Sequence, residues 1–225
     1  GGVFPAIAKR EHQIALPELL EKILKKLKVK NNKPNFDLIA VTVGPGLEPA
    51  LWVGITFAKA LAEVWNLPLI PVNHMEGHLV SSILRKDNKV NLIDFPAMSL
   101  LVSGGHTEII YAKSLNNYKK IGETLDDACG EAYDKVARML GLPYPGGPEI
   151  EKLAKQNSNV EIKLPRPMMH SKDFNFSYSG LKTAVLYTVR DLGGIQKMTQ
   201  EQKIAVAKEF QNAAIEVLVH KTMKA

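Results

Sequence analysis

The chain is poor in cysteine and has no long apolar run. A single cysteine among 225 residues excludes a disulfide within the chain and is typical of a protein from a reducing compartment. No apolar segment approaches the roughly 18 to 20 residues needed to cross a bilayer, and the first residues do not resemble a signal peptide. We therefore expect a cytoplasmic protein that does not enter the membrane.

Arginine is also scarce, with five residues in a chain whose net charge is +6. Nucleic-acid sites rely on arginine more heavily than this, so the charge gives only weak support for an anionic partner. The densest basic stretch, EKILKKLKVKNNK, has a structural explanation, because apolar residues recur there at helical spacing after Pro17. They are Leu16, Leu19, Leu20, Ile23, Leu24 and Leu27. Its lysines are then expected on the solvated face of a helix.

The first half of the chain alternates between short apolar runs and segments with helical spacing. FDLIAVTVGPG (36–46) and LPLIPVN (67–73) predict buried strands, each followed by a helical segment, 48–66 and 74–86. This β-α-β-α order predicts a parallel sheet covered by helices. Sites in such sheets gather where strands end and helices begin, and His74 occupies that place.

The second half predicts another α/β unit. The polar stretch 85–96 separates the halves, which suggests two lobes at residues 1–95 and 96–225. The expected elements of the second lobe are a hairpin (97–102 and 107–113), a third strand (118–124), helices at 125–142 and 181–192, and a Pro/Gly-rich insertion between those helices. Thr199 and Gln202 have capping-box spacing at the start of a final helix that continues to the last residue. We expect the sequence to be a fragment.

Two histidines, His74 and His78, stand four positions apart in the segment NHMEGH. On a helix both imidazoles leave the same face, an arrangement used as half of a zinc or iron site, and Gly77 allows close approach to that face. Glu76 would point roughly 200° away from His74, which argues against a zinc protease. A metal held here would instead hold or polarise a substrate. Possible third ligands are His12, His106 and His170, although no spacing supports them.

Two glycine-containing segments and an acidic helix suggest a second binding region. In LLVSGGHTEII the Ser103–Gly105 turn could cradle an anion with its amides and hydroxyl, although most such turns are only structural. The predicted helix that follows carries an acidic stripe, Asp127, Glu131 and Asp134, suited to ribose hydroxyls or a cation. Residues 144–148, YPGGP, form a second glycine turn, and Cys129 is expected to be buried.

Six segments in one order resemble the TsaD family of universal tRNA threonylcarbamoyladenosine transferases, specifically its bacterial branch. They are GGVFPAIAKREH, VTVGPGL, NHMEGH, LLVSGGHTEII, GETLDDACGEAYDKVARMLGLPYPGGP and FSYSGLKTA, and the likeness covers essentially the whole chain. The resemblance implies an α/β fold of the actin-like, sugar kinase and Hsp70 type (ASKHA), with two lobes. It also implies transfer of threonylcarbamoyl from threonylcarbamoyl-AMP to the N6 amine of the adenosine beside the tRNA anticodon.

The resemblance also assigns residues, a cofactor and partners. It implies that His74 and His78 bind one iron or zinc ion, with a third ligand outside this chain. It implies that the adenylate is bound by Leu101, Val102, Ser103, Gly104, Gly105, Asp134 and Gly147. The implied partners are tRNA and the TsaB and TsaE subunits. Since the family's first strands and its last metal ligand are missing, we expect residues 1–225 alone to be inactive.

Two rival classes of protein share the expected fold. A non-catalytic actin-like partner subunit would not need the histidine pair, so NHMEGH argues against it. An actin-like ATPase or sugar kinase would turn over ATP without tRNA, and that turnover would not depend on the two imidazoles.

Overall fold

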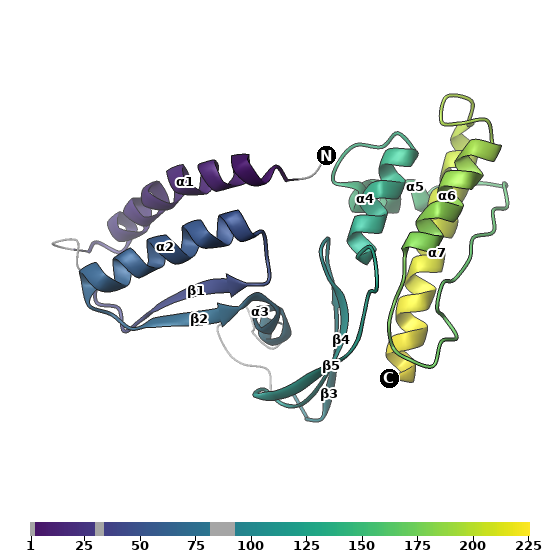
Figure 1. The fold of residues 1–225 in the computed structure, drawn as a ribbon. Helices are drawn as coiled ribbons and strands as arrows, with labels where there is room; N and C mark the ends of the chain where they lie inside the picture. The colour runs from purple at the N-terminus through teal and green to yellow at the C-terminus, as the bar shows by residue number, and fades with distance from the viewer. Residues whose placement is uncertain (1–2, 30–33, 82–92) are drawn as a thin grey trace. The chain divides into compact units, whose positions relative to one another are not determined.

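The computed structural model describes residues 3–29, 34–81 and 93–225, and the chain folds into two compact units. Unit 1 is Gly1–Asn91 and unit 2 is Leu92–Ala225. Most of the predicted boundary stretch, 85–96, lies outside the described residues. Figure 1 shows the helices and strands of each unit.

Unit 1 is built on two parallel strands, β1 (Ile39–Gly44) and β2 (Leu69–Asn73). Helix α2 (Glu48–Trp65) connects them and packs along β1, and α3 (His74–Ser81) begins directly after β2. This confirms the predicted β-α-β-α order. The prediction of fully buried strands was wrong, because both strands contain only half-buried and exposed residues. A two-stranded sheet covered chiefly by one helix leaves much of its surface accessible.

Helix α1 (Pro5–Lys26) begins earlier than the sequence suggested. Proline is favoured in the first helical turn, and the sequence offers two candidates, Pro5 and Pro17. The prediction used Pro17, whereas the helix starts at Pro5 and passes through Pro17. Helix α1 lies beside α2 (Figure 1). None of its residues is fully buried, so the predicted apolar stripe is only partly covered in unit 1.

Unit 2 combines an antiparallel sheet with four helices. The strands β3 (Ala97–Val102), β4 (Thr107–Ser114) and β5 (Asn117–Glu123) pair in the order β3-β4-β5, as the predicted hairpin and third strand require. The helices are α4 (Cys129–Met139), α5 (Gly146–Ala154), α6 (Ser179–Asp191) and α7 (Gln200–Lys224). Their apolar sides meet the sheet in one core that includes Ile109, Val136, Phe176 and Phe210.

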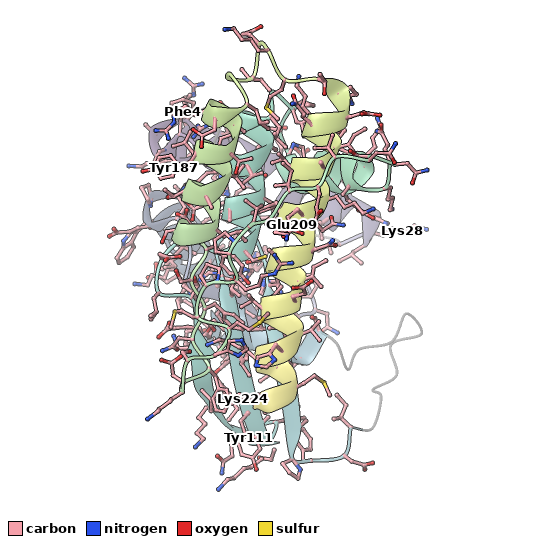
Figure 2. All side chains as sticks on the ribbon, turned by 90° about the vertical axis from the view of Figure 1, so that its right-hand side faces the viewer. Phe4, Lys28, Tyr111, Tyr187, Glu209 and Lys224 are labelled. Carbon is pink, nitrogen blue, oxygen red and sulfur yellow. The ribbon has the colours of Figure 1, made fainter. Side chains whose placement is uncertain are left out.

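Helix α7 holds the long segment 155–178, which is part of the predicted insertion, in place. Figure 2 shows its side chains, with Glu209 midway along the helix and Lys224 at its end. Arg166 from the segment forms ion pairs with Glu209 and Glu216 of α7. The predicted capping box is confirmed, since Thr199 and Gln202 each bind the other's backbone amide.

Among the helices of the described residues, none is long and apolar enough to cross a membrane.

Helix α4 starts four residues later than predicted, at Cys129 instead of Leu125. Asp126 and Asp127 precede the helix. The prediction that Asp127, Glu131 and Asp134 form an acidic stripe on one helix was therefore wrong for Asp127. The predicted glycine turn at 144–148 was also wrong in part, because Gly146 and Gly147 form the first turn of α5. The later start of α4 agrees with contacts between residues distant in the sequence, such as the bond from the Cys129 amide to the Thr107 hydroxyl.

Candidate functional site

The two histidines of unit 1 face one another on α3. The Nε2 atoms of His74 and His78 are 3.1 Å apart, and both side chains are exposed. Two imidazole nitrogens at about 2.0–2.1 Å from one ion would be separated by about 2.9 Å at a right angle and about 3.4 Å at a tetrahedral angle. The observed spacing falls between these values. The residues therefore fit the two-ligand half of a metal site.

The start of α3 positions this pair. Asn73 ends β2, and its side-chain oxygen accepts a hydrogen bond from the amide of Met75, which satisfies a donor of the first helical turn. His74 thus follows a strand end and opens a helix, and His78 follows one turn later. A Cβ atom added at Gly77 would meet no atom of the described residues within 4 Å, so these residues leave the helix open beside the pair.

The described residues contain no group of three or more His, Cys, Asp or Glu side chains that could hold a metal ion. The other histidines considered from the sequence have different neighbours. His12 contacts the carbonyl of Ala8 within α1, His106 lies in the β3–β4 turn, and His170 packs edge-on against His220. No third ligand can therefore be assigned from the described ranges 3–29, 34–81 and 93–225.

The Ser103–Gly105 turn of unit 2 is organised by the serine hydroxyl. The amide of Ser103 donates to the carbonyl of His106 at 2.8 Å, which closes the hairpin. The hydroxyl oxygen of Ser103 accepts from the amides of His106 at 3.0 Å and Gly105 at 3.3 Å. The Ser103 hydroxyl is therefore bound to amides of its own turn. Gly104 and Gly105 are exposed, and a Cβ at either would meet no atom within 4 Å in the part of the chain that the structure describes.

Asp134 and Gly147, predicted to share one substrate, lie close together in unit 2. One carboxylate oxygen of Asp134 accepts a hydrogen bond of 2.7 Å from the amide of Gly146, the first residue of α5. Gly147 follows directly, and a Cβ there would have no described residue within 4 Å. The carboxylate is thus held at the start of α5 beside an open glycine.

Helix α4 links these two parts of the predicted site. Near its start, the amide of Gly130 donates to the carbonyl of Ser103 at 3.2 Å. Asp134 lies four residues further on, which is one turn and about 6 Å along the helix. The fold therefore brings Ser103–Gly105, Asp134 and Gly147 together in unit 2. Leu101 and Val102 lead into the turn as the last residues of β3.

Asp126 and Asp127, the two aspartates before α4, have specific side-chain partners. Asp126 accepts hydrogen bonds from Ser177, Tyr178 and Ser179 at the start of α6. Partial burial opposes its ionisation, but these donors outweigh burial and lower the pKa of its carboxyl below the usual value. Sequence reasoning missed these contacts, because the partners lie more than 50 residues away. The serines beside a helix start were the available signal.

Asp127 forms ion pairs with Lys135 of α4 and Lys182 of α6. Partial burial works against its charge, yet the two lysines lower the pKa of the Asp127 carboxyl. Cys129 is buried, as predicted, and burial raises the pKa of its thiol to about 11. Both observations fit structural roles for these side chains.

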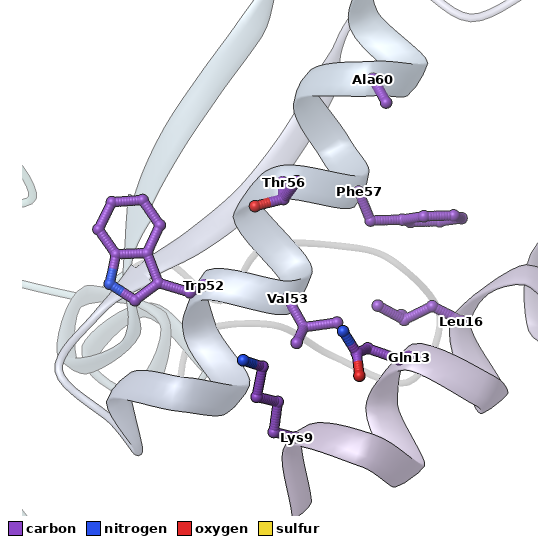
Figure 3. Close-up of a pocket in the computed structure, with 8 residues that line it drawn as sticks. All are labelled: Lys9, Gln13, Leu16, Trp52, Val53, Thr56, Phe57 and Ala60. Atoms are coloured by element: carbon purple, nitrogen blue, oxygen red, sulfur yellow. The ribbon is translucent and has the colours of Figure 1, made fainter. Parts of the chain in front are cut away.

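Unit 1 also contains a pocket of about 470 Å³ between α1 and α2 (Figure 3). The residues that line it are Lys9, Gln13, Leu16, Trp52, Val53, Thr56, Phe57 and Ala60. None of the predicted site residues is among them. Its wall is largely apolar, which does not suit an adenylate phosphate.

Comparison with known proteins gives consistent matches over the whole chain. The family model described as TsaD, tRNA N6-adenosine threonylcarbamoyltransferase, matches residues 1–225. Curated proteins named tRNA N6-adenosine threonylcarbamoyltransferase are similar to it: 49% identical in Thermosipho melanesiensis and 47% in both Bacillus subtilis and Ralstonia pickettii. Each alignment covers 100% of this chain and, in the same order, 65%, 62% and 63% of the relative.

Proposed function

Because this chain belongs to the TsaD family, whose fold is of the actin-like ASKHA class, we propose that it carries much of a tRNA N6-adenosine threonylcarbamoyltransferase. The observation that carries this proposal is the family match over all 225 residues. The chain spans less than two thirds of the length of the curated relatives reported above, so the activity is proposed for a polypeptide of their full length. Units 1 and 2 would supply parts of its two lobes.

The proposed reaction moves the threonylcarbamoyl group from threonylcarbamoyl-AMP to the N6 amine of an adenosine in tRNA. The amine nitrogen forms a bond to the carbonyl carbon, the carbonyl–phosphate anhydride bond breaks, and AMP and a proton leave. Since the donor is already activated, the protein mainly has to position the reactants and stabilise charge on the carbonyl oxygen. We assign no general base.

In unit 1, His74 and His78 would bind one iron or zinc ion. Their facing Nε2 atoms support this, because each must be unprotonated to act as a ligand and both can then reach one ion. The bound ion would supply Lewis acidity toward the threonylcarbamoyl carbonyl. Glu76 leaves the helix roughly 200° from His74, so metal-assisted peptide hydrolysis with this glutamate as base is not expected.

In unit 2, the Ser103–Gly105 turn and Asp134 would bind the adenylate. The exposed turn offers the backbone amide hydrogen of Gly104 to the phosphate, and Leu101 and Val102 lead the chain into it. Asp134 has one carboxylate oxygen held by Gly146, and its other oxygen would accept hydrogen bonds from ribose hydroxyls. Gly147 would leave room for the nucleoside beside it.

We further propose tRNA as the substrate and the TsaB and TsaE subunits as partners, in the cytoplasm. The test is transfer of isotopically labelled threonylcarbamoyl from its adenylate to tRNA, by a polypeptide of the relatives' full length that contains these 225 residues. Label in the modified adenosine supports the proposal. ATP turnover without tRNA, unchanged after His74→Ala and His78→Ala, would identify an actin-like ATPase instead. A polypeptide inactive in both assays would point to a non-catalytic subunit.

A further inference from the structure

The start of α4 lies unusually close to the Ser103–Gly105 turn, and Gly130 is the residue that permits this. A Cβ added at Gly130 would lie 2.7 Å from the carbonyl oxygen of Ser103 and 2.9 Å from both the nitrogen and the Cα of Gly104. These are backbone atoms, so they cannot rotate out of the way as a flexible side chain could. Any larger residue at this position must therefore displace the turn or the helix.

A second contact holds the same helix start against the hairpin. Thr107 is completely buried at the first position of β4, and its hydroxyl oxygen accepts a 2.8 Å hydrogen bond from the amide of Cys129. The first two amides of α4, those of Cys129 and Gly130, are thus both bound to the hairpin. Amides at a helix start often bind ligands. Here the amides of Cys129 and Gly130 bind the hairpin and not a ligand.

The outer side of the turn remains open. Gly104 and Gly105 are exposed, and the amide of Gly104 makes no hydrogen bond within the described residues. The amide of Gly105 is already directed at the hydroxyl of Ser103. Gly104 is therefore the residue of the turn whose amide can donate to a ligand, and its position depends on the contact with Gly130.

We infer that Gly130 is a positioning residue of the proposed adenylate site, which lets α4 clamp the turn so that the Gly104 amide is directed at the phosphate. This inference rests on the proposed function, because it takes the phosphate of an adenylate as the ligand. A preorganised donor stabilises an anion without having to be ordered when the ligand arrives. Displacing the turn should therefore weaken phosphate binding in particular.

Gly130→Ala tests this, with Gly180→Ala as a matched control. Gly130 is the second residue of α4, and Gly180 is the second residue of α6. Among the described residues, a Cβ at Gly180 would meet the Cγ of Pro167 alone, at 3.6 Å, which is an ordinary contact. Both substitutions place alanine at the same helical position, so their effects on helix propensity should be alike. They differ because the Cβ at position 130 clashes with the Ser103–Gly105 turn, whereas the Cβ at position 180 does not.

The measurement is calorimetric titration with AMP and with adenosine, together with the melting temperature, in a polypeptide of the relatives' full length. We expect Gly130→Ala to bind AMP about tenfold more weakly, which is the effect of weakening one hydrogen bond to a charged oxygen. Its affinity for adenosine should be nearly unchanged. Gly180→Ala should bind both as the parent does. Unchanged AMP binding by Gly130→Ala, or an equal loss for AMP and adenosine, would overturn the inference.

A second pair of variants covers the case in which Gly130→Ala does not fold. Thr107→Val removes the acceptor for the Cys129 amide, whereas Thr107→Ser keeps it. Only the valine variant should lose affinity for AMP relative to adenosine, and equal behaviour of the two variants would contradict the inference. A different experiment decides the proposed function, which would be wrong if the parent polypeptide did not transfer threonylcarbamoyl to tRNA.

Discussion

Asp126 caps helix α6 through Ser179. Its carboxylate accepts hydrogen bonds from the hydroxyl of Ser179 at 2.6 Å and from the amide of Ser179 at 3.1 Å, and Ser179 is the first residue of the helix. Bonds from Ser177 and from the amide of Tyr178 complete the set. One side chain thereby ties the segment between β5 and α4 to a helix start that lies 53 residues further along the chain.

We expect Asp126→Ala to lower the free energy of unfolding by about 1–2 kcal/mol, the usual cost of losing a helix cap. Asp191→Ala is the control. Asp191 is exposed and, within the described ranges, pairs with its neighbour Arg190 alone, so the loss should stay within about 0.5 kcal/mol. Urea unfolding followed by circular dichroism measures both changes. Equal losses in the two variants would show that the cap contributes nothing specific.

The same carboxylate should make stability depend on pH. Partial burial raises the pKa of Asp126, but the donors from Ser177, Ser179 and Tyr178 lower it more, so the folded-state pKa lies below the unfolded one. The unfolded state then takes up the proton first, and the stabilisation is present above the ordinary carboxyl value of about 3.9 and lost as the pH falls through the lower folded-state pKa.

Wild type should therefore exceed Asp126→Asn in unfolding free energy near neutral pH, with the difference shrinking in acid. Urea unfolding at a series of pH values measures this difference. A variant that lacks the hydroxyls of Ser177 and Ser179 should show a weaker dependence on pH, because those hydroxyls lower the pKa. A difference that stays constant from neutral pH into acid would refute the assignment.

Lys221 of α7 should contribute more to stability than its exposed neighbour Lys224. Its side chain is completely buried, and its ammonium group donates to the Ser171 hydroxyl at 2.7 Å and to the Asn175 carbonyl. Lys221→Met would leave these partly buried acceptors without the Lys221 donor, at a cost of roughly 2–4 kcal/mol.

Lys224 donates to the carbonyl of Ser171 from an exposed position, so Lys224→Met should cost no more than about 0.5 kcal/mol. Both values come from the same urea unfolding experiment. Similar costs for Lys221→Met and Lys224→Met would mean that the buried contacts do not hold the segment 171–175.

Much of the fold follows from local sequence patterns. The parallel β1–β2 pair, the β3–β4 hairpin and the capping box at Thr199 all depend on residues that are close in sequence or on a regular spacing. For the same reason the i, i+4 spacing of His74 and His78 was enough to predict that their rings share one face of α3.

Features that depend on distant partners were not predictable in this way. Helix α4 begins at Cys129 because Asp126 is bonded to α6 and the Cys129 amide to Thr107. Spacing alone cannot reveal either contact. Pro5 and Pro17 both satisfy the preference for proline in a first turn, so the start of α1 was ambiguous. The role of Gly130 depends on the position of Ser103 and Gly104 in space.

We propose that His74 and His78 together hold one metal ion in a polypeptide of the relatives' full length. Metal content by plasma mass spectrometry tests it most directly, in a polypeptide of the relatives' full length, with His12→Ala as the control because His12 lies on α1. We expect about one iron or zinc ion per chain in the parent and in His12→Ala, and a large loss in His74→Ala and His78→Ala. Full metal content after removal of both imidazoles would contradict the account.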